Sequence, residues 1–474
     1  MEKELSRLYL SFAGKNPERI TPLPQSGSNR KYFRLTGGCG SIIGVKGERK
    51  EENRTFCAFA KHFLAKGINV PEVYALSEDG LCYIQQDLGE ESLFERLSGA
   101  RASGNYSKND IVLLKDTIRQ LVKCQIVGDK GLNYGQCFEE EQLSKRGIIF
   151  DLHYFKYCFL KASGVAYNEY RLENDFELLA ADLVKASPNG FLYRDFQARN
   201  VMLFHNKPYL IDFQGGKKGP VHYDLASFVY QAKSNYPQSI KRILIDTYKE
   251  EYHAITGEKL PENFDQTLQL FVFFRTLQVL AAYGFRGNFE RKAHFLESIP
   301  FAIANLEKCL PICEKYPYLK EVLNALVAKY NCPKTAEEGL TIEISSFSYK
   351  KGIPADNSGN GGGYVFDCRG HNNPGRYEEY KRLTGLDEPV KEFLRTRSGI
   401  DGWLCEIYKI IDPHIEVFLS RDFHHLQVSF GCTGGHHRSV YSAEALAAHI
   451  KEKYPQVRIV ISHPESGVAP HEYE

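Results

Sequence analysis

Two neighbouring segments decide the fold of this chain: Leu192-Tyr193-Arg194-Asp195-Phe196-Gln197-Ala198-Arg199-Asn200-Val201-Met202 and Tyr209-Leu210-Ile211-Asp212-Phe213. They place carboxylates at Asp195 and Asp212 and an amide at Asn200. Apolar runs on either side of His205-Asn206-Lys207 predict a tight β-hairpin. Because a hairpin returns the chain to its start, we expect Asn200 and Asp212 to lie side by side at its open end, with Asp195 on the preceding loop.

This set of side chains suits kinase-type phosphoryl transfer. One carboxylate accepts the hydrogen bond of the attacking hydroxyl, while an Asn oxygen and a second carboxylate hold Mg²⁺ against the phosphates. Protein kinases use His-Arg-Asp, four residues, Asn, and later Asp-Phe-Gly. This chain keeps Arg194-Asp195 and Asn200 at that spacing, with Tyr193 for the His and Gln214 for the Gly. The alternative interpretation is a surface loop that carries these polar residues by chance.

Residues 1–330 resemble the aminoglycoside phosphotransferase and choline kinase superfamily, and are most similar to its branch of anomeric N-acetylmuramate and N-acetylglucosamine kinases. The matching segments are Arg194 to Met202, Ile211 to Gly216, Gly219-Pro220 and Tyr223 to Ser227. The resemblance implies a bilobal α+β protein-kinase-like fold. A β-rich, nucleotide-binding lobe is expected over residues 1–90, and a helical catalytic lobe over residues 91–330.

The same resemblance implies roles for particular residues. Asp195 is expected to be the base, with Arg194 beside it in the catalytic loop, and Asn200 and Asp212 are expected to bind Mg²⁺. Asp224 is expected to support the loop by hydrogen bonding, without reacting itself.

Three segments are expected to bind ATP. The small residues of Ser26-Gly27-Ser28 let backbone N–H groups approach phosphate oxygens, although such residues also form ordinary turns. Lys46 ends a predicted strand where kinases place a phosphate-binding Lys. Residues 58–64 contain no Glu to orient it, so a plain surface Lys is the alternative, and only Glu51 and Glu52 are nearby. Gln86-Asp87-Leu88 resembles the family's hinge, whose backbone meets the adenine.

The sequence gives weaker signals for the pocket that would bind the acceptor. Asp151-Leu152-His153-Tyr154-Phe155 lies where related kinases shape this pocket, but aromatic residues at helical spacing are favoured as core. Arg275 and Arg286 flank an apolar helix and would either meet substrate or form structural contacts.

Length and composition limit the number of domains and the classes of partner. A chain of 474 residues predicts two or three domains. Lys plus Arg (60) and Asp plus Glu (59) nearly cancel, so no global field recruits nucleic acid or membrane. No apolar signal segment opens the chain, and the apolar run Leu268 to Phe285 is interrupted by polar residues, which indicates a buried helix. Twelve scattered Cys predict reduced thiols and a cytoplasmic protein.

A second domain is predicted over residues 340–474, after a polar linker at residues 331–339. Strand residues from His424 lead into Gly431-Cys432-Thr433-Gly434-Gly435-His436-His437-Arg438-Ser439, followed by a helix. Free N–H groups and the helix dipole then favour a bound anion, with Arg438 able to fork onto a phosphate.

This second domain, a smaller α/β domain, closely resembles the RapZ C-terminal domain family. The matching segments are Ser346 to Pro354, Phe366 to Arg369, Thr384 to Asp387 and Gly431 to Tyr441. The resemblance implies a phosphosugar or anion site that uses Lys350, Arg369, Cys432, Thr433, Gly434, Gly435, His437, Arg438 and Ser439. His436 stands where the family has Lys, and no basic run ends the chain, which disfavours RNA more than a phosphosugar.

Cys432, five residues, then Arg438 is also the spacing of cysteine phosphatases. The glycine-rich interior favours a binding-only loop, and no Asp is placed as general acid, so phosphatase activity is the lesser alternative.

Together these patterns predict an ATP- and Mg²⁺-dependent amino-sugar kinase fused to a phosphosugar-sensing domain. The alternative is a regulatory adapter in which the kinase half is degenerate and the second half binds RNA or protein.

Overall fold

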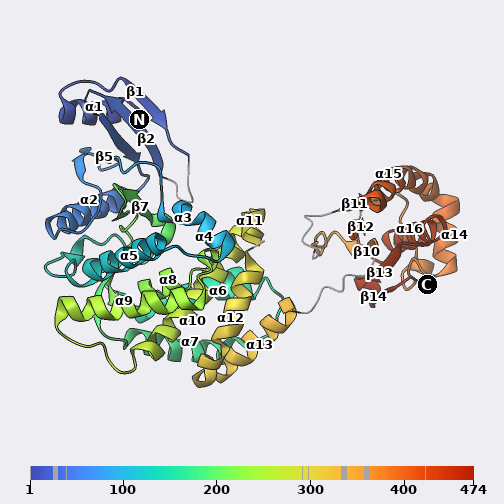
Figure 1. The fold of residues 1–474 in the computed structure, drawn as a ribbon. Helices are drawn as coiled ribbons and strands as arrows, with labels where there is room; N and C mark the ends of the chain where they lie inside the picture. Colours follow the sequence, from blue (N-terminus) through green and yellow to red (C-terminus); the bar gives the residue numbers. More distant parts are fainter. Residues whose placement is uncertain are drawn as a thin grey trace. The chain divides into compact units, whose positions relative to one another are not determined.

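The chain forms two compact units, Met1–Cys332 and Pro333–Glu474 (Figure 1). The computed structural model describes residues 2–24, 30–38, 40–290, 292–296, 298–331, 339–356, 363–421 and 423–473. Two predicted segments therefore fall wholly or largely outside the described residues: the Ser26-Gly27-Ser28 loop, and the linker between 331 and 339. The finer domain boundaries expected from the sequence stay predictions.

The small lobe of unit 1 is an antiparallel sheet in the order β1-β2-β3-β5-β4, covered by one helix on each face. Side chains alternate between the faces of a strand. Ile42 of β3 therefore packs with Leu5 of α1, while its neighbour Ile43 packs with Phe56 and Phe59 of α2. The bounds are α1 Glu2–Ala13, β1 Arg19–Pro22, β2 Lys31–Gly37, β3 Gly40–Lys46, α2 Lys50–Ala65, β4 Val73–Leu76 and β5 Cys82–Gln86.

The larger lobe is mainly helical and begins after β5 (Figure 1). Its helices are α3 Leu93–Arg96, α4 Ser98–Ser103, α5 Lys108–Ile126, α6 Lys145–Phe155, α7 Glu169–Val184, α8 His222–Val229, α9 Gln238–Thr256, α10 Phe264–Gly284, α11 Ala293–Leu296, α12 Ile299–Cys309 and α13 Pro317–Asn331. Its strands are β6 Asn189–Leu192, β7 Val201–Phe204, β8 Lys207–Leu210 and β9 Lys217–Pro220, with a short 3-10 turn η3 at Ala198–Asn200.

Helix α10 contains the apolar run noted in the sequence and packs against α6, α8 and α12. By length and composition alone, Phe264–Gly287 could cross a membrane, yet 56% of its most apolar window is buried inside the protein. Phe271, Phe273 and Phe274 are fully buried in the core of the lobe. The prediction of a buried helix is confirmed.

The predicted hairpin is β7–β8, with Val201 opposite Leu210 and Phe204 opposite Lys207. Its two turn residues, His205 and Asn206, both adopt left-handed backbone angles (φ 50° and 58°). Two such residues are typical of a type I′ turn, whose twist matches that of paired strands. This tight turn fixes the register, and the register decides which residues meet at the open end of the hairpin.

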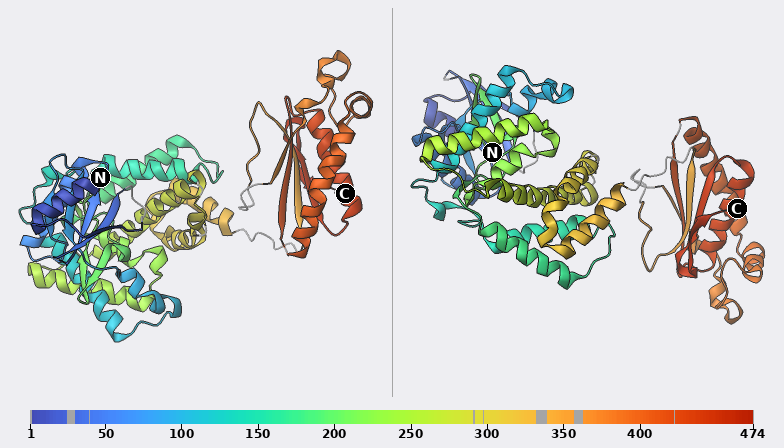
Figure 2. Two further views of the ribbon diagram at one scale, coloured as in Figure 1. Left: turned by 90° about the horizontal axis from the view of Figure 1, so that it is seen from above. Right: turned by 60° about the horizontal axis from the view of Figure 1, so that its bottom comes forward.

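Unit 2 contains a mixed sheet in the order β11-β12-β10-β13-β14, in which only β14 runs antiparallel to its neighbour. Helix α16 packs against β10, β12 and β13, α15 packs against α16, and the helices lie on one face of the sheet (Figure 2). The bounds are β10 Thr341–Ser348, β11 Tyr364–Asp367, α14 Glu388–Arg397, α15 Ile400–Ser420, β12 His425–Cys432, α16 Arg438–Lys453, β13 Arg458–His463 and β14 Val468–Glu472. The expected fold class, a bilobal kinase-like domain followed by a smaller α/β domain, is confirmed.

Candidate active site

Asp195, Asn200 and Asp212 meet at the open end of the β7–β8 hairpin. The Asn200 side-chain amide donates to the Asp195 backbone carbonyl (2.9 Å) and carboxylate (3.1 Å), and it lies 3.5 Å from the Asp212 carboxylate. The Asp195 and Asp212 side chains remain 37% and 32% exposed. Two carboxylates and one amide therefore share a single, solvent-accessible site, as the spacing in the sequence predicts.

Backbone strain marks the same site. Arg194 (φ 78°) and Asp212 (φ 68°) both adopt the left-handed region, which costs a non-glycine residue about 1 kcal/mol or more. Tyr193 is fully buried, and its hydroxyl donates to the carbonyl of Ile211, directly before Asp212. The Tyr at the position of the kinase His therefore holds the segment that carries Asp212 in place.

Asp224, at the start of α8, is the anchor of the catalytic loop. It is fully buried and accepts hydrogen bonds from the backbone N–H groups of Tyr193 (2.7 Å) and Arg194 (2.9 Å) and from the Gln125 amide (3.0 Å). Burial raises the pKa of Asp224 to about 6, although these donors oppose the rise. The carboxylate is ionised at neutral pH, and it compensates the strain at Arg194 with two charge-assisted hydrogen bonds.

Neighbouring side chains orient the carboxylates of Asp195 and Asp212. The Gln197 amide donates to Asp195, and the Arg199 guanidinium lies 3.5 Å from the same carboxylate. The Gln214 amide, at the position of the kinase Gly, donates to Asp212 at 2.7 Å. These contacts fix the rotamers of both carboxylates without enclosing them.

The donor set fits Mg²⁺ better than a transition metal. Among the described residues, no group of three or more His, Cys, Asp or Glu side chains could form a closed metal cage. Mg²⁺ is usually held by one or two carboxylates and completes its shell with water and substrate phosphates. Asp212 and the Asn200 carbonyl oxygen provide ligands of that kind.

Arg30, which the sequence did not single out, reaches this site from the small lobe. Its guanidinium is only 5% exposed, pairs with Glu52 of α2 at 2.7 Å and lies 3.5 Å from the Asp212 carboxylate. A cation held by a helix Glu, as in kinases, is therefore present, but it is an arginine directly before β2. The signal that could have found it is strand alternation, since Arg30 shares a face with Tyr32, which packs toward α2.

Lys46 is not brought to Asp212. It ends β3 directly opposite Lys31. By strand alternation it shares the sheet face of Ile42, which packs with α1 and not with α2. The Lys46 charge acts instead on Asp79, whose pKa it helps to lower after the hydrogen bonds from Ser77 and Leu81. Glu52, considered in the sequence as the partner of Lys46, pairs with Arg30.

The predicted hinge, Gln86-Asp87-Leu88, follows the end of β5. Asp87 accepts hydrogen bonds from the Arg34 guanidinium (2.7 Å) and the Gly89 backbone N–H (2.9 Å). These hydrogen bonds and one from Ser41 lower its pKa, against burial, the largest influence, which raises it. Leu88 is buried. The Asp87 side chain therefore ties the hinge to β2, and the contact between this segment's backbone and a nucleotide stays a prediction.

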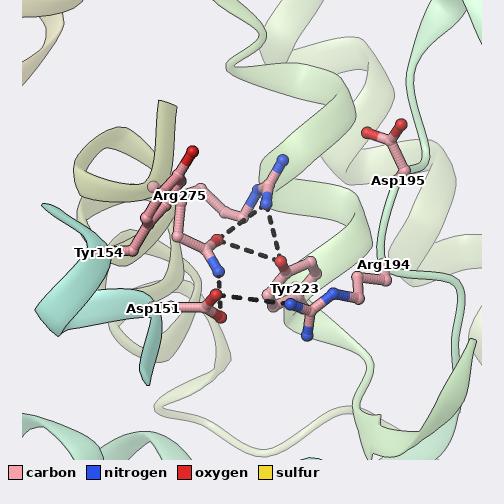
Figure 3. A pocket seen from close by; sticks show the side chains of 7 residues that line it. Asp151, Tyr154, Arg194, Asp195, Tyr223 and Arg275 are labelled. Carbon is pink, nitrogen blue, oxygen red and sulfur yellow. Dashed lines mark hydrogen bonds and ion pairs between the residues drawn. The ribbon is translucent and has the colours of Figure 1, made fainter. Parts of the chain in front are cut away.

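A cavity of about 220 Å³ lies beside Asp195 in the helical lobe (Figure 3). It is lined by Asp151, Tyr154, Arg194, Asp195, Tyr223, Arg275 and Gln278. Figure 3 shows Asp195 standing apart from the group joined by hydrogen bonds and an ion pair, which contains Asp151, Arg194, Tyr223 and Arg275. A molecule in this cavity would lie against the Asp195 carboxylate.

Hydrogen bonds pre-organise the floor of this cavity. Arg275 donates to the Tyr223 hydroxyl (2.7 Å) and to the Gln278 carbonyl oxygen (2.8 Å), and Gln278 in turn donates to Asp151 (2.6 Å). Asp151 also lies 3.4 Å from Arg194, and burial raises its pKa, although Arg194 opposes the rise. Among the described residues, Arg275 forms no ion pair with a carboxylate.

The sequence left open whether residues 151–155, Arg275 and Arg286 belong to the core, to structural contacts or to the acceptor pocket. Leu152 and Phe155 are fully buried core residues, while Asp151 and Tyr154 of the same helix line the cavity. Arg275 lines the cavity as well, whereas Arg286 lies over the ring of Phe295 at 5.4 Å.

In unit 2, the glycine-rich loop joins β12 to α16 and surrounds Cys432. The buried Cys432 sulfur accepts the Gly435 backbone N–H (3.2 Å) and lies 3.2 Å from the Ser439 hydroxyl. These hydrogen bonds lower the thiol's pKa, although burial, the largest influence, opposes them. Gly435 has φ 77°, and a Cβ there would lie 2.4 Å from the Glu465 side chain, so the tight loop requires glycine.

Arg438 makes its shorter hydrogen bonds outside this loop. It is 4% exposed and donates to the backbone carbonyls of His371 (2.8 Å) and Arg369 (3.1 Å), with Thr433 at 3.4 Å. Both carbonyl hydrogen bonds come from one terminal nitrogen, and Nε of Arg438 has no hydrogen-bond partner among the described residues. A fork onto a phosphate through Nε and the other terminal nitrogen would displace only the Thr433 contact. The first terminal nitrogen clamps the turn that follows β11.

The remaining residues of the predicted anion site lie around the loop with varied partners. Arg369 is paired with Asp367 at 2.6 Å and stacks over Tyr349 at 3.8 Å. His437 contacts the Tyr380 carbonyl at 2.9 Å, and burial lowers its pKa. Lys350 follows β10, where its backbone N–H donates to Ser348, whose hydroxyl bonds to the Thr433 carbonyl. Gly434 is exposed, and a Cβ there would meet only His436, at 3.6 Å.

Comparisons with known proteins agree with the division of the chain into two units. The family model described as "Phosphotransferase enzyme family" matches residues 19–262, and the model described as "RapZ C-terminal domain" matches residues 340–466. A "Nucleotide-binding protein" of Delftia acidovorans is 31% identical over 169 residues, which is 36% of this chain and 48% of that protein. The chain spans about half the length of the curated relatives it matches.

Solved structures of similar fold include a putative aminoglycoside phosphotransferase from Ralstonia eutropha (TM-score 0.45, 11% identity, 69% of this chain and 98% of that one). Another is a choline kinase from Cryptosporidium parvum (TM-score 0.45, 12% identity, 70% and 99%).

Proposed function

This chain belongs to the phosphotransferase enzyme family, and from that premise we propose that unit 1 transfers a phosphoryl group from ATP to a hydroxyl group of an amino sugar. The observation that carries the proposal is the meeting of Asp195, Asn200 and Asp212 beside a cavity. Phosphoryl transfer is catalysed mainly by positioning and electrostatic stabilisation, and these residues supply both.

Each residue has a distinct part in the reaction. Asp195 orients the acceptor hydroxyl and takes its proton, while Asn200 and Asp212 hold the divalent ion. Mg²⁺, when bound there, would neutralise charge on the phosphates. Arg30 takes the phosphate-binding role that the sequence assigned to Lys46, because its charge lies beside Asp212. ATP as donor fits the cytoplasmic location expected from the sequence.

We call the cavity beside Asp195 the acceptor cavity. The charges of the residues that line it support a neutral or anionic acceptor. Asp151 already forms an ion pair with Arg194, while Arg275 donates to neutral oxygens. A polycationic aminoglycoside or a quaternary ammonium group would therefore meet a guanidinium that forms no ion pair among the described residues, although its charge acts on Asp151 and Asp224. A sugar hydroxyl suits Gln278 and Asp151, and the carboxylate of N-acetylmuramate would suit Arg275, because Arg binds carboxylates with two parallel hydrogen bonds.

The test is a coupled ATPase assay with four acceptors: N-acetylmuramate, N-acetylglucosamine, kanamycin and choline. Turnover is expected with at least one N-acetylated sugar. It should be lost in Asp195→Ala but retained in Asp246→Ala, a carboxylate exposed on α9. Arg275→Met should lower turnover of N-acetylmuramate more than that of N-acetylglucosamine. Inactivity on both sugars, with activity on kanamycin or choline, would reject the proposed acceptor.

For unit 2 we propose a phosphosugar-binding role and not phosphatase activity. The Cys432 side chain is buried, and one terminal nitrogen of Arg438 already donates to two backbone carbonyls, so the nucleophile is enclosed and the guanidinium is only partly free. Para-nitrophenyl phosphate should not be hydrolysed. Hydrolysis that disappears in Cys432→Ser would establish the phosphatase alternative.

The adapter alternative makes a different prediction for the same protein. If unit 2 binds RNA, its affinity should fall steeply with salt, because phosphate contacts release counterions. RNA binding of that kind, together with no ATP turnover on any acceptor, would replace the kinase proposal.

A further inference from the structure

A second cavity opens in the helical lobe of unit 1, on another face of α10. Its volume is about 340 Å³, and it lies between the end of α8 and the helices α9, α10 and α12. From α10 it uses Gln269 and Thr276, whereas the acceptor cavity uses Arg275 and Gln278. Residues three or four positions apart share a helix face, so these two pairs mark separate stripes on the same helix. The two cavities share no lining residue.

The charge of this second cavity is positive and uncompensated. Lys241 of α9 and Lys308 of α12 both line it, and its lining contains no Asp or Glu. In the described part of the chain, neither lysine forms an ion pair with a carboxylate. Burial lowers the pKa of Lys241, and the charge of Lys308 lowers it further. Two ammonium groups that repel each other in a partly desolvated site favour an anion between them.

The other polar groups in the cavity are neutral. Gln238, Gln269 and Asn305 line it, and Gln269 donates to the Tyr230 hydroxyl at 2.9 Å. Gln238 is the first residue of α9, a helix of 19 residues whose N-cap makes no side-chain hydrogen bond, so the positive end of the helix dipole adds to the lysine charges. Amides and a hydroxyl are suited to sugar hydroxyl groups, and the lysines to a phosphate.

We propose that this cavity binds a phosphate monoester carried on a small polyhydroxylated body, such as a hexose phosphate. The ester dianion would bridge Lys241 and Lys308, while its hydroxyl groups would meet Gln238, Gln269 and Asn305. A cavity of about 340 Å³ lies within the usual size of small-molecule sites and is too small for a macromolecular segment. Because the site is separate from the acceptor cavity, the molecule bound there is not the proposed acceptor substrate.

The test is isothermal titration of the full chain with glucose 6-phosphate, and with glucose as the uncharged probe. Glucose 6-phosphate is expected to bind, and Lys241→Met and Lys308→Met are each expected to weaken that binding at least tenfold. Lys308 is exposed on α12, so its substitution leaves the core intact. The matched control is Arg242→Met, which removes a charge from the adjacent, 84% exposed residue and should change the affinity less than twofold.

Three outcomes would overturn the proposal. Equal affinity for glucose and glucose 6-phosphate would exclude an anion site. Unchanged affinity in both lysine variants would place the bound phosphate elsewhere, including the loop of unit 2. An equal loss in Arg242→Met would reduce the effect to general surface charge. Sugar phosphorylation without added glucose 6-phosphate should be unaffected in both lysine variants, so a failure of the kinase proposal would be seen separately.

Discussion

Two loops of this protein carry residues suited to phosphate chemistry, and they differ in what their polar groups already contact. In the catalytic loop of unit 1, Asp195 and Asp212 accept from neutral amides, lie 3.5 Å from Arg199 and Arg30 respectively, and keep about a third of their surface exposed. In the glycine-rich loop of unit 2, Cys432 is buried and Arg438 donates to two backbone carbonyls, while its Nε has no hydrogen-bond partner among the described residues. The first arrangement leaves oxygen atoms available for a metal and a substrate. The second uses part of its charged group to hold the fold.

The difference teaches that residue types at a given spacing identify a possible chemistry, whereas the surrounding hydrogen bonds decide whether it is available. Substitutions in each loop should therefore have opposite consequences. Unit 1 should lose activity and keep its fold, and unit 2 should lose its fold while phosphotransfer continues.

The largest effect is expected from Asp212→Asn, which removes the charge that would hold the divalent ion. We expect kcat to fall about a thousandfold, the scale on which preorganised electrostatic groups act. EDTA should abolish wild-type turnover, and excess Mg²⁺ should restore it. Cys432→Ser is the control and should remain fully active. An Asp212→Asn enzyme with more than a tenth of wild-type activity would show that the two loops do not differ as described.

Next in size is Arg438→Met, which should destabilise unit 2 by about 3 kcal/mol, because two partly buried carbonyls lose a charged donor. Trp403, the only Trp in the sequence, lies against Phe366 and Phe430 in unit 2 and reports its urea unfolding by fluorescence. Arg395→Met, at a 49% exposed side chain, is the matched control. An unchanged unfolding midpoint in Arg438→Met would mean that the guanidinium is free to bind phosphate.

Arg30→Met should raise the KM for ATP about thirtyfold, the value of losing one hydrogen bond to a charged group. Lys46→Met should change it less than twofold, because Lys46 lies on the α1 face of the sheet. Steady-state kinetics with varied ATP separates the two. If Lys46→Met has the larger effect, the phosphate contact belongs to the residue that the sequence suggested.

The smallest effect concerns pH. His222 is fully buried between Phe264 and Phe271, has no hydrogen-bond partner among the described residues, and burial lowers its pKa to about 4. The folded protein therefore resists protonation, and the stabilising contribution of neutral His222 is lost as the pH falls from about 6.5 through about 4. Between pH 7.5 and 5 the loss should be about 2 kcal/mol.

Asp224 acts in the opposite direction, because its pKa is raised to about 6 and its contribution falls as the pH rises from about 4 to 6. The test compares wild type with the variant His222→Phe. Asp224 is unchanged in this variant, so its contribution cancels when the free energies of unfolding of the two proteins are subtracted. Urea unfolding of the two proteins, followed by far-ultraviolet circular dichroism, should therefore diverge as the pH falls to 5. Parallel pH profiles would contradict the buried, neutral state of His222.

Local patterns predicted those features that depend on neighbouring residues. The β7–β8 hairpin followed from two apolar runs around His205-Asn206, and its register brought Asn200 to Asp212. The roles of Arg30 and Arg438 could not be predicted in this way. Arg30 meets Glu52 and Asp212 only after the sheet has packed on α2, and Arg438 meets carbonyls of a turn that is 67 residues away for its shorter contact. Arg275 stayed undecided in the sequence because an apolar helix does not reveal which of its stripes faces a cavity.

Arg30 also has a mechanical consequence. The residue directly precedes β2 of the small lobe, pairs with Glu52 of α2, and lies beside an aspartate of the helical lobe. A rotation that parts the two lobes must therefore pull this guanidinium away from Asp212. If a nucleotide enters between the lobes, as proposed, the same movement would break this ion pair.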